Sequence, residues 1–413
     1  MDRIIERCAG LDVHKDSVTA CVRVPGAPGG RDQKTQTFGT TTRSLLALRD
    51  WLAAWGVTVV GMESTGGYWK PVYALLEDDF EPWLLNAHHL KAVPGRKTDV
   101  RDAEWIGQLV EHGLVRASFV PPRDIRELRD LTRYRKALIQ ERPREVQRRD
   151  KVLQDAGIKL SAVAPDVLGV SGRAMLAALV EGTRDPAGLG ELAKGQLRKT
   201  LPQRREALVG RFRGHHALLV GELLAHIEDL EDAIERLSQE GERRLGPFAR
   251  EVELLDTIPG IDRRAAEVIL AEIGAAMTRF PTARHLASWA GRCPGNDESA
   301  GKRRTGRRRK GSKWLAITLT ECANSVVRSK RTSRASQYAR IKGRRGHKKA
   351  IGAVAHSILT IAYHVLQRGR PYAELGPDYL LLRDNAEAYT KRLVRQLERL
   401  GHKVTLERLP LSA

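Results

Sequence analysis

The sequence predicts an α/β domain at the N-terminus followed by a mainly helical remainder. Short apolar runs alternate with helical patterns over the first 120 residues, which favours a mixed sheet covered by helices. Two long helical patterns rich in Arg and Glu follow, near 124–155 and 213–243. Residues 301–350 then hold 18 Lys and Arg against one acid, whereas 1–120 hold 14 basic and 15 acidic residues. The 413 residues allow roughly two to four domains, one of which is suited to binding a polyanion.

The N-terminal elements can be assigned in chain order from their periodicity and turn residues. We expect a strand, a turn at His14–Asp16 and a second strand over 8–24, then a third strand at 36–38, a helix at 42–55, a strand at 57–63, a helix at 68–79 that Pro71 breaks near its start, a strand at 81–86 and a helix at 99–113. This order matches that of ribonuclease H-like domains, in which the first strand carries the first catalytic Asp.

Four acidic residues stand at the ends of these elements. Asp12 and Glu63 end apolar strand-like runs, and Asp99 and Asp102 lie three apart on one side of a helix turn. Divalent cations that prefer oxygen ligands need several carboxylates at one point. Any one of these acids alone would be expected to be an ordinary surface residue, because the chain has 50 Asp and Glu. The ordered set predicts a metal site.

The middle of the chain is predicted to hold two long helices. The first, at 124–155, should be exposed and should be kinked or interrupted by Pro143. The two helices could form an antiparallel coiled coil around a more globular stretch at 156–205, either as a hairpin packed on its own domain or as an arm for self-association. We expect the second, sharper alternative, with protomers joined by a seam of apolar residues and one His: His216, Val220, Leu223, Ile227, Leu230, Ile234 and Leu237.

A turn between two helical patterns is the first candidate phosphate site. Residues 254–274 predict a helix, a Pro-Gly turn at 259–260 and a second helix, which resembles a helix-hairpin-helix. Its turn amides and the following helix N-terminus can hold a phosphate. An ordinary helix turn is the alternative.

A serine in a basic, Gly-containing stretch at 298–315 is the second candidate. Small residues allow close approach to a phosphate, and Lys or Arg neutralise its charge. Ser299 could therefore attack phosphorus, or it could only contact a phosphate. The residues expected to bind nucleic acid are Gly301, Lys302, Arg303, Arg304, Arg307, Arg308, Arg309, Lys310 and Lys313.

The cysteines and the hydropathy point to an intracellular protein. Cys8, Cys21, Cys293 and Cys322 form no Cys-x-x-Cys pair and have no His at zinc spacing, so we expect reduced thiols, mostly in cores. No signal peptide is recognised, and no apolar stretch is expected to reach the roughly 18 residues of a membrane span. A cytoplasmic, bacterial protein that associates with the nucleoid when bound to DNA, with no membrane partner, is expected.

Several motifs taken together resemble the transposases of the insertion-sequence 110 family, the bridge-RNA-guided recombinases. They are GLDVHKDSV, ESTGGYWKPVY, KTDVRDAEWI, the stretch from IPGI to CPGNDESAGKRRTG, and AVAHSILTIAYHVL. The resemblance runs from Gly10 to about Tyr379. The chain departs from the family pattern at Arg292, where an apolar residue is usual, at Ala316, where Arg is frequent, and at Pro143.

The resemblance implies a domain organisation and a set of site residues. It implies a RuvC-like domain at 1–123, a helical coiled-coil region at 124–245, a transposase domain with the serine and the basic segment at 246–385, and a C-terminal tail at 386–413. Ser299 would be the nucleophile of a Ser-x-Gly motif. The DEDD ligands of Mg²⁺, or of Mn²⁺, would be Asp12, Glu63, Asp99 and Asp102. A structured bridge RNA would pair with donor and target DNA, and the protein would be a homo-oligomer, a dimer or tetramer, whose active site could be shared between subunits.

The expected activity is site-specific DNA recombination through a covalent phosphoserine, with Mg²⁺ stabilising the developing charge. One alternative is a metal-dependent, junction-resolving nuclease in which the acids activate water and Ser299 only contacts phosphate. A covalent protein–DNA adduct would separate these two. The other alternative is a non-enzymatic RNA- or DNA-binding protein, which loss of activity on chelation would exclude.

Overall fold

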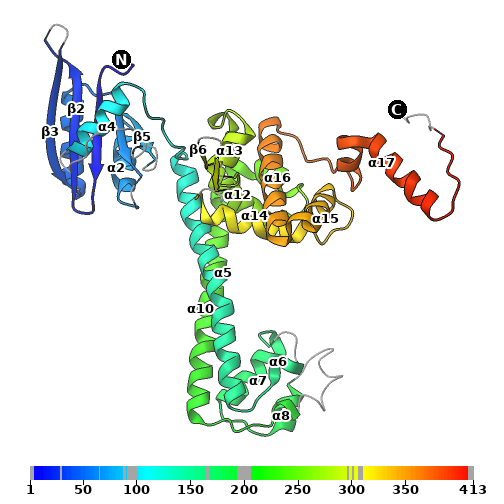
Figure 1. Ribbon diagram of the computed structural model, residues 1–413. Helices are drawn as coiled ribbons and strands as arrows, with labels where there is room; N and C mark the ends of the chain where they lie inside the picture. Colours follow the sequence, from blue (N-terminus) through cyan, green and yellow to red (C-terminus); the bar gives the residue numbers. More distant parts are fainter. Residues whose placement is uncertain are drawn as a thin grey trace. The chain divides into compact units, whose positions relative to one another are not determined.

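The computed structural model describes residues 4–27, 30–64, 66–86, 90, 101–163, 167–192, 206–294, 297–299, 302–305 and 310–407. The chain divides into two compact units, Met1–Val120 and Pro121–Ala413 (Figure 1). The domain boundary predicted at 123/124 lies three residues from this division.

The first unit is built on a five-stranded sheet in the order β3-β2-β1-β4-β5. β2 pairs antiparallel with β1 and β3, whereas β4 pairs parallel with β1 and β5. The strands are β1 (Cys8–Val13), β2 (Ser17–Pro25), β3 (Arg31–Gly39), β4 (Val59–Glu63) and β5 (Glu81–Leu85), and the helices described between and after them are α1 (Thr42–Ala54), α2 (Trp69–Leu76) and α4 (Arg101–Glu111). The predicted order of strands and helices is confirmed. The predicted break at Pro71 is wrong, because Pro71 lies in the first turn of α2, where its missing N–H has no helical partner to lose.

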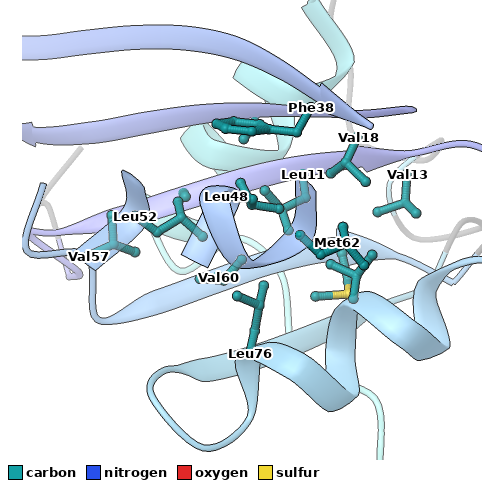
Figure 2. Close-up of a cluster of buried hydrophobic side chains, with 14 of the residues drawn as sticks. Leu11, Val13, Val18, Phe38, Leu48, Leu52, Val57, Val60, Met62 and Leu76 are labelled. Atoms are coloured by element: carbon teal, nitrogen blue, oxygen red, sulfur yellow. The ribbon is translucent and has the colours of Figure 1, made fainter. Parts of the chain in front are cut away.

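The two faces of this sheet carry separate apolar cores, because successive strand residues point to opposite faces. Leu11 and Met62 belong to the core that contains residues of α1 and α2 (Figure 2). Cys8 and Val59 belong to a second core, together with residues of α4. The helix α4 therefore covers the face of β1 and β4 that α1 and α2 leave open.

Glycines let α4 lie very close to this face. A Cβ on Gly10 would lie 2.1 Å from the carbonyl oxygen of Ala103 and 2.3 Å from the backbone nitrogen of Gly107. A Cβ on Gly61 would lie 2.6 Å from Cγ2 of Val110. Side chains larger than hydrogen at these strand positions would push α4 away from the sheet.

A buried ion-pair cluster holds the C-terminal end of α4. The Glu111 carboxylate is 1% exposed and contacts Nε of Arg23 at 2.5 Å and Nε of Arg31 at 2.8 Å. Removing one partner of such a cluster leaves a buried charge without compensation. The cluster and the glycine contacts together fix the position of α4 along β1.

The second unit begins with a pair of long antiparallel helices, α5 (Arg123–Asp155) and α10 (Gly214–Leu245). Glu127 near the start of α5 pairs with Arg244 near the end of α10, and Asp155 at the end of α5 contacts His216 at the start of α10. The two predicted long helices are confirmed, and they pair within one chain (Figure 1).

Two expectations for this helix pair are corrected. The helix α5 is continuous through Pro143, so the predicted interruption is wrong. Ile125, Leu128 and Leu138 are buried, so α5 is not an exposed helix either. Packing along α10 supplies tertiary contacts on both sides of the proline, which local propensity does not consider.

Part of the predicted α10 seam is buried within the single chain. Val220 and Ile227 are 0% exposed and Leu230 is 5% exposed, mainly because α10 packs along α5. Leu223, Ile234 and Leu237 are partly buried, and a role of the seam in joining protomers stays a prediction. Within one chain, the structure shows the packed hairpin.

A small helical cluster lies between the two long helices in sequence. It contains α6 (Leu160–Val163), α7 (Val170–Val180) and α8 (Pro186–Glu191). Leu153 of α5 and Val220 of α10 share an apolar core with residues of these short helices. The globular stretch predicted at 156–205 is therefore packed on the ends of α5 and α10.

Most of the remaining helices form a bundle around α12 and α16, and α17 contacts α15. The elements are the 3₁₀ turn η2 (Gly246–Phe248), α11 (Ala249–Asp256), α12 (Arg263–Ile273), η3 (Met277–Arg279), α13 (Ala283–Trp289), the strands β6 (Asp297–Ser299) and β7 (Lys302–Thr305), α14 (Lys313–Val326), α15 (Ser333–Arg345), α16 (His347–Arg368) and α17 (Tyr379–Arg399). The boundary predicted at 385/386 falls inside α17.

One helix of the bundle, α16, is long and apolar enough to cross a membrane by length and composition, contrary to the expectation that no stretch would be. Ile351, Val354 and Ile358 of α16 are buried in the bundle, as expected for a core helix.

Three of the four cysteines are buried as predicted, and burial raises the pKa of the Cys8 and Cys322 thiols to about 12.

The contact between Gly10 and α4 gives a first prediction. Gly10→Ala places a Cβ against the α4 backbone, and we expect it to destabilise the first unit by about 1–3 kcal/mol, as overpacking does. Thermal unfolding measures the change. Gly67→Ala is the matched control, because a Cβ there meets nothing within 4 Å. Equal melting temperatures for the two variants would show that α4 adjusts without cost.

Candidate active site

Two of the predicted acids lie side by side at one edge of the sheet. β1 and β4 are parallel neighbours in which Leu11 pairs with Met62, so Asp12 and Glu63 follow this pair on adjacent strands. Both acids stand two residues after the glycines that face α4, Gly10 and Gly61. By the alternation of strand side chains, Asp12 and Glu63 point to the face that α4 covers.

The third described acid comes from α4. Asp102 lies in its first turn, next to Ala103, whose carbonyl oxygen is in close contact with Gly10. Burial raises the pKa of the Asp12 carboxyl, and the negative charges of Asp102 and Glu63 raise this pKa further, in that order. Asp102 and Glu63 are therefore near enough to Asp12 for their charges to act on it.

A histidine that sequence reasoning did not select also belongs to this site. His14 Nε2 lies 3.0 Å from Asp12 Oδ2, and its charge and hydrogen bond act to lower the pKa of Asp12. The signal was present in GLDVHKD, because a residue two positions after Asp12 near a tight turn can fold back onto it. His14 is 65% exposed, so it only partly offsets the repulsion among the acids.

The three carboxylates are the type of ligand that a hard divalent cation prefers, but in this structure their oxygen atoms do not all lie within 4.8 Å of one another. Three carboxylates from a strand pair and a helix turn supply oxygen ligands, and Mg²⁺ and Mn²⁺ are among the ions that prefer oxygen. Such an ion would also offset the burial and the neighbouring negative charges that raise the pKa of Asp12. Asp99, the fourth predicted ligand, lies outside the described residues.

The second predicted constellation lies in the other unit, on a short hairpin. Ser299 ends β6, and the backbone register of the antiparallel pair places Lys302 of β7 opposite it. Arg303 pairs with Glu298 in the same ladder, and Arg304 also lies in β7. Of the other predicted nucleic-acid-binding residues, Gly301, Arg307, Arg308 and Arg309 lie outside the described residues.

The chain just after this hairpin is held firmly in the bundle. A Cβ on Gly311 would lie 2.3 Å from the carbonyl oxygen of Ala290, so Gly311 packs against the end of α13. Ser312 caps α14 by accepting the Leu315 N–H, and its hydroxyl donates to the buried Glu272 carboxylate at 2.8 Å. The segment that carries Ser299 therefore has one fixed end.

Glu272 is the centre of this attachment. Its carboxylate is 0% exposed and accepts two hydrogen bonds from Arg133 of α5, at 2.6 and 2.9 Å. Arg129 of α5 donates to the carbonyl oxygens of Ala271 and Glu272 at the end of α12. One carboxylate thus joins α5, α12 and the start of α14.

Two predicted cations near the hairpin are described with their side chains. Lys310 and Lys313 are both exposed, and the Lys313 ammonium lies 4.8 Å from the centroid of the Trp314 ring.

The chain departs from the family pattern at Arg292 and Ala316, and these two residues contact each other. The Arg292 guanidinium donates a hydrogen bond to the Ala316 carbonyl oxygen.

A cluster of exposed cations that the residue-level prediction missed lies where α15 meets α16. We call it the basic corner, and it consists of Arg340, Lys342, Arg344, Arg345, Lys348 and Lys349, all exposed. Gly346 separates the two helices with a φ of +78°. The concentration of Lys and Arg in 301–350 was the available signal, but it did not say which cations a fold would gather.

The turn predicted to hold a phosphate packs against α14, and two of the amides near it form hydrogen bonds within the bundle. Gly260 has a φ of +88°, and a Cβ there would lie 2.6 Å from the Cys322 carbonyl oxygen, so the turn packs on α14. The Ile261 N–H donates to the Ile258 carbonyl oxygen, and the Asp262 side chain accepts the Ala265 N–H. These amides already have partners, and the acid disfavours a phosphate there.

Comparison with protein families gives two matches. The family model of the DEDD transposases of the IS110 type, described as a transposase, matches residues 9–158. A second model, described as the transposase IS116/IS110/IS902 family, matches residues 252–339. The first match spans the four predicted acids and the second spans Ser299. No protein in the curated set matches the chain.

The raised pKa of Asp12, caused first by burial and then by the neighbouring acids, gives a second prediction. The raised pKa means that folding disfavours the ionised carboxylate, so a stability cost exists above this pKa and disappears below the pKa of the unfolded chain. Asp12→Asn should therefore raise the melting temperature near neutral pH without divalent cations. The gain should shrink as the pH falls toward about 4, where Asp ordinarily titrates.

The control is Asp16→Asn, which makes the same charge change at an exposed turn position. Added Mg²⁺ should stabilise the wild type and not Asp12→Asn. A gain for Asp12→Asn that is independent of pH would contradict the electrostatic explanation.

Proposed function

The chain belongs to the insertion-sequence 110 family of transposases, and we propose that it is a site-specific DNA recombinase that mobilises an insertion sequence. The observation that carries this proposal is the convergence of Asp12, Glu63 and Asp102 at one sheet edge. Phosphoryl transfer needs stabilisation of charge on phosphate oxygens, which such a cation-binding acidic site provides.

We propose that the first unit is a RuvC-like, ribonuclease H-like domain with a DEDD metal site. The strand order β3-β2-β1-β4-β5, with the first acid on the central strand, supports this. Asp12, Glu63, Asp102 and, by the family pattern, Asp99 would hold Mg²⁺, with Mn²⁺ as the alternative. The cation, when bound, supplies electrostatic stabilisation of negative charge on the phosphate.

Ser299 is proposed as the nucleophile. Its hydroxyl oxygen forms a bond to phosphorus, and the bond from phosphorus to the 3′ oxygen of the DNA breaks. Serine loses one proton, and the released 3′ oxygen gains one to become a 3′-hydroxyl. A serine is a weak nucleophile at neutral pH, so it requires cationic surroundings. The hairpin register that sets Lys302 opposite Ser299, with Arg303 and Arg304 beside it in sequence, supports this role.

The proposed guide is a structured bridge RNA that pairs with donor and target DNA. Base pairing would then select the sites, and the protein would bind RNA and DNA mainly through backbone shape and phosphates. The exposed Lys310, Lys313 and the basic corner support this division of labour, since exposed cations contact phosphates without reading sequence. The protein is proposed to act in the cytoplasm, at the nucleoid, as a homo-oligomer.

The decisive experiment is a search for a covalent protein–DNA adduct. We expect wild-type protein with guide RNA, DNA and Mg²⁺ to form a protease-sensitive adduct, and Ser299→Ala to bind both nucleic acids but form none. Asp102→Asn should lower adduct formation and recombination by orders of magnitude, because one acid of the cation site is lost. Denaturing gel electrophoresis with labelled DNA measures both.

Two outcomes would redirect the proposal. Recombination by Ser299→Ala without any adduct would favour the metal-dependent nuclease, since that mechanism needs the acids alone. An adduct formed by Ser299→Ala would assign the nucleophile to another residue. A mixture of Ser299→Ala and Asp102→Asn proteins should regain activity if different subunits can supply the two sets of groups.

The basic corner gives a prediction on salt dependence. Replacing Arg344 and Lys348 by Ala should reduce the slope of log affinity against log salt by up to about two, if each cation neutralises one phosphate. The control pair, Lys151→Ala with Arg236→Ala, makes the same charge change at exposed positions of α5 and α10. Equal slopes for the two pairs would place the nucleic acid away from the corner.

A further inference from the structure

We propose that the helix pair α5/α10 carries a transition-metal site formed by Glu141, Glu145 and His226. The ligand atoms of these three residues all lie within 4.8 Å of one another. Glu141 and Glu145 are four residues apart on α5, so they share one face, and His226 comes from α10. An ion bound there would link the two helices.

The exposure of the three residues suits entry of an ion. Glu145 is 3% exposed, whereas Glu141 and His226 are exposed. Arg148 contacts the Glu145 carboxylate at 2.5 Å, but the Arg148 side chain is 65% exposed and can turn into solvent. The buried carboxylate would then exchange an arginine for a metal ion.

The donor set selects the class of metal. One imidazole nitrogen and two carboxylate oxygens suit Zn²⁺ and similar transition metals, while Mg²⁺ prefers oxygen ligands alone. Zinc lies about 2.0–2.2 Å from such atoms, so two ligand atoms of one ion are at most roughly 4.4 Å apart. Small side-chain rotations close the remaining gap, and water would fill the fourth position.

The position of the cluster gives the site a structural role. Pro143 lies midway between Glu141 and Glu145, and a proline inside a helix removes one backbone hydrogen bond and crowds the preceding turn. A metal ion bound to residues on both sides of Pro143 and to α10 would brace α5 where its own hydrogen bonding is weakest.

The other three-residue cluster found among the described residues does not offer the same chemistry. Asp155, His215 and His216 also lie close together. The Nδ1 atom of His216 accepts the Arg213 N–H, so a neutral His216 carries its proton on Nε2, 3.0 Å from the Asp155 carboxylate. This histidine has no free lone pair for a metal.

The proposal does not rest on the recombinase function, and its test needs no DNA. We expect the full-length protein, stripped of metal, to bind one more Zn²⁺ ion than His226→Ala, by titration against a chromophoric zinc indicator. Glu141→Gln should weaken this binding by at least tenfold, and the melting temperature should rise with Zn²⁺ in the wild type but not in His226→Ala. His215→Ala is the matched control and should behave as wild type.

Two further measurements separate this site from others. Asp12→Asn should retain the zinc-dependent rise in melting temperature, which excludes the acidic site in the first unit as its origin. Millimolar Mg²⁺ should not displace the zinc. Equal zinc stoichiometry and melting in wild type, Glu141→Gln and His226→Ala, all folded by circular dichroism, would overturn the proposal.

Discussion

The close contact between Gly10 of β1 and the backbone of α4 is the constraint on which the candidate active site depends. With only hydrogen at Gly10, the Ala103 carbonyl can approach to a distance that no Cβ would tolerate. That approach brings Asp102 beside the strand end that bears Asp12. The buried Glu111 cluster fixes α4 at its other end. If the helix moved along the sheet or away from it, the buried Glu111 carboxylate would lose its arginine partners, which costs free energy.

Two carboxylates of the first unit, Glu111 and Asp12, have opposite electrostatic environments. Glu111 is buried with two arginines, an arrangement that supports the fold. Asp12 is partly buried beside two other acids, and burial and their charges keep its pKa above the usual value. Perturbed carboxyl groups of this kind are common at functional sites, where stability is given up for function.

The sequence predicts the first unit well because its signals are local. Short apolar runs place β1 and β4, and these strands bring Asp12 and Glu63 to one edge. The errors concern tertiary contacts. Pro143 is tolerated because α10 packs along α5, and the same packing buries Val220, Ile227 and Leu230 of the α10 seam within the chain. His14 and the basic corner were missed because residue counts do not show which side chains a turn or a helix junction gathers.

The attachment at Glu272 has a mechanical consequence. A single carboxylate binds Arg133 on the long helix α5 and Ser312 at the flank of the hairpin that bears Ser299. A second pair, Lys136 of α5 with Glu321 of α14, joins the same two helices. Bending of α5 in this region would therefore move the start of α14 with it, so a macromolecule that loads the helical arm would also displace the chain that follows the serine hairpin in sequence.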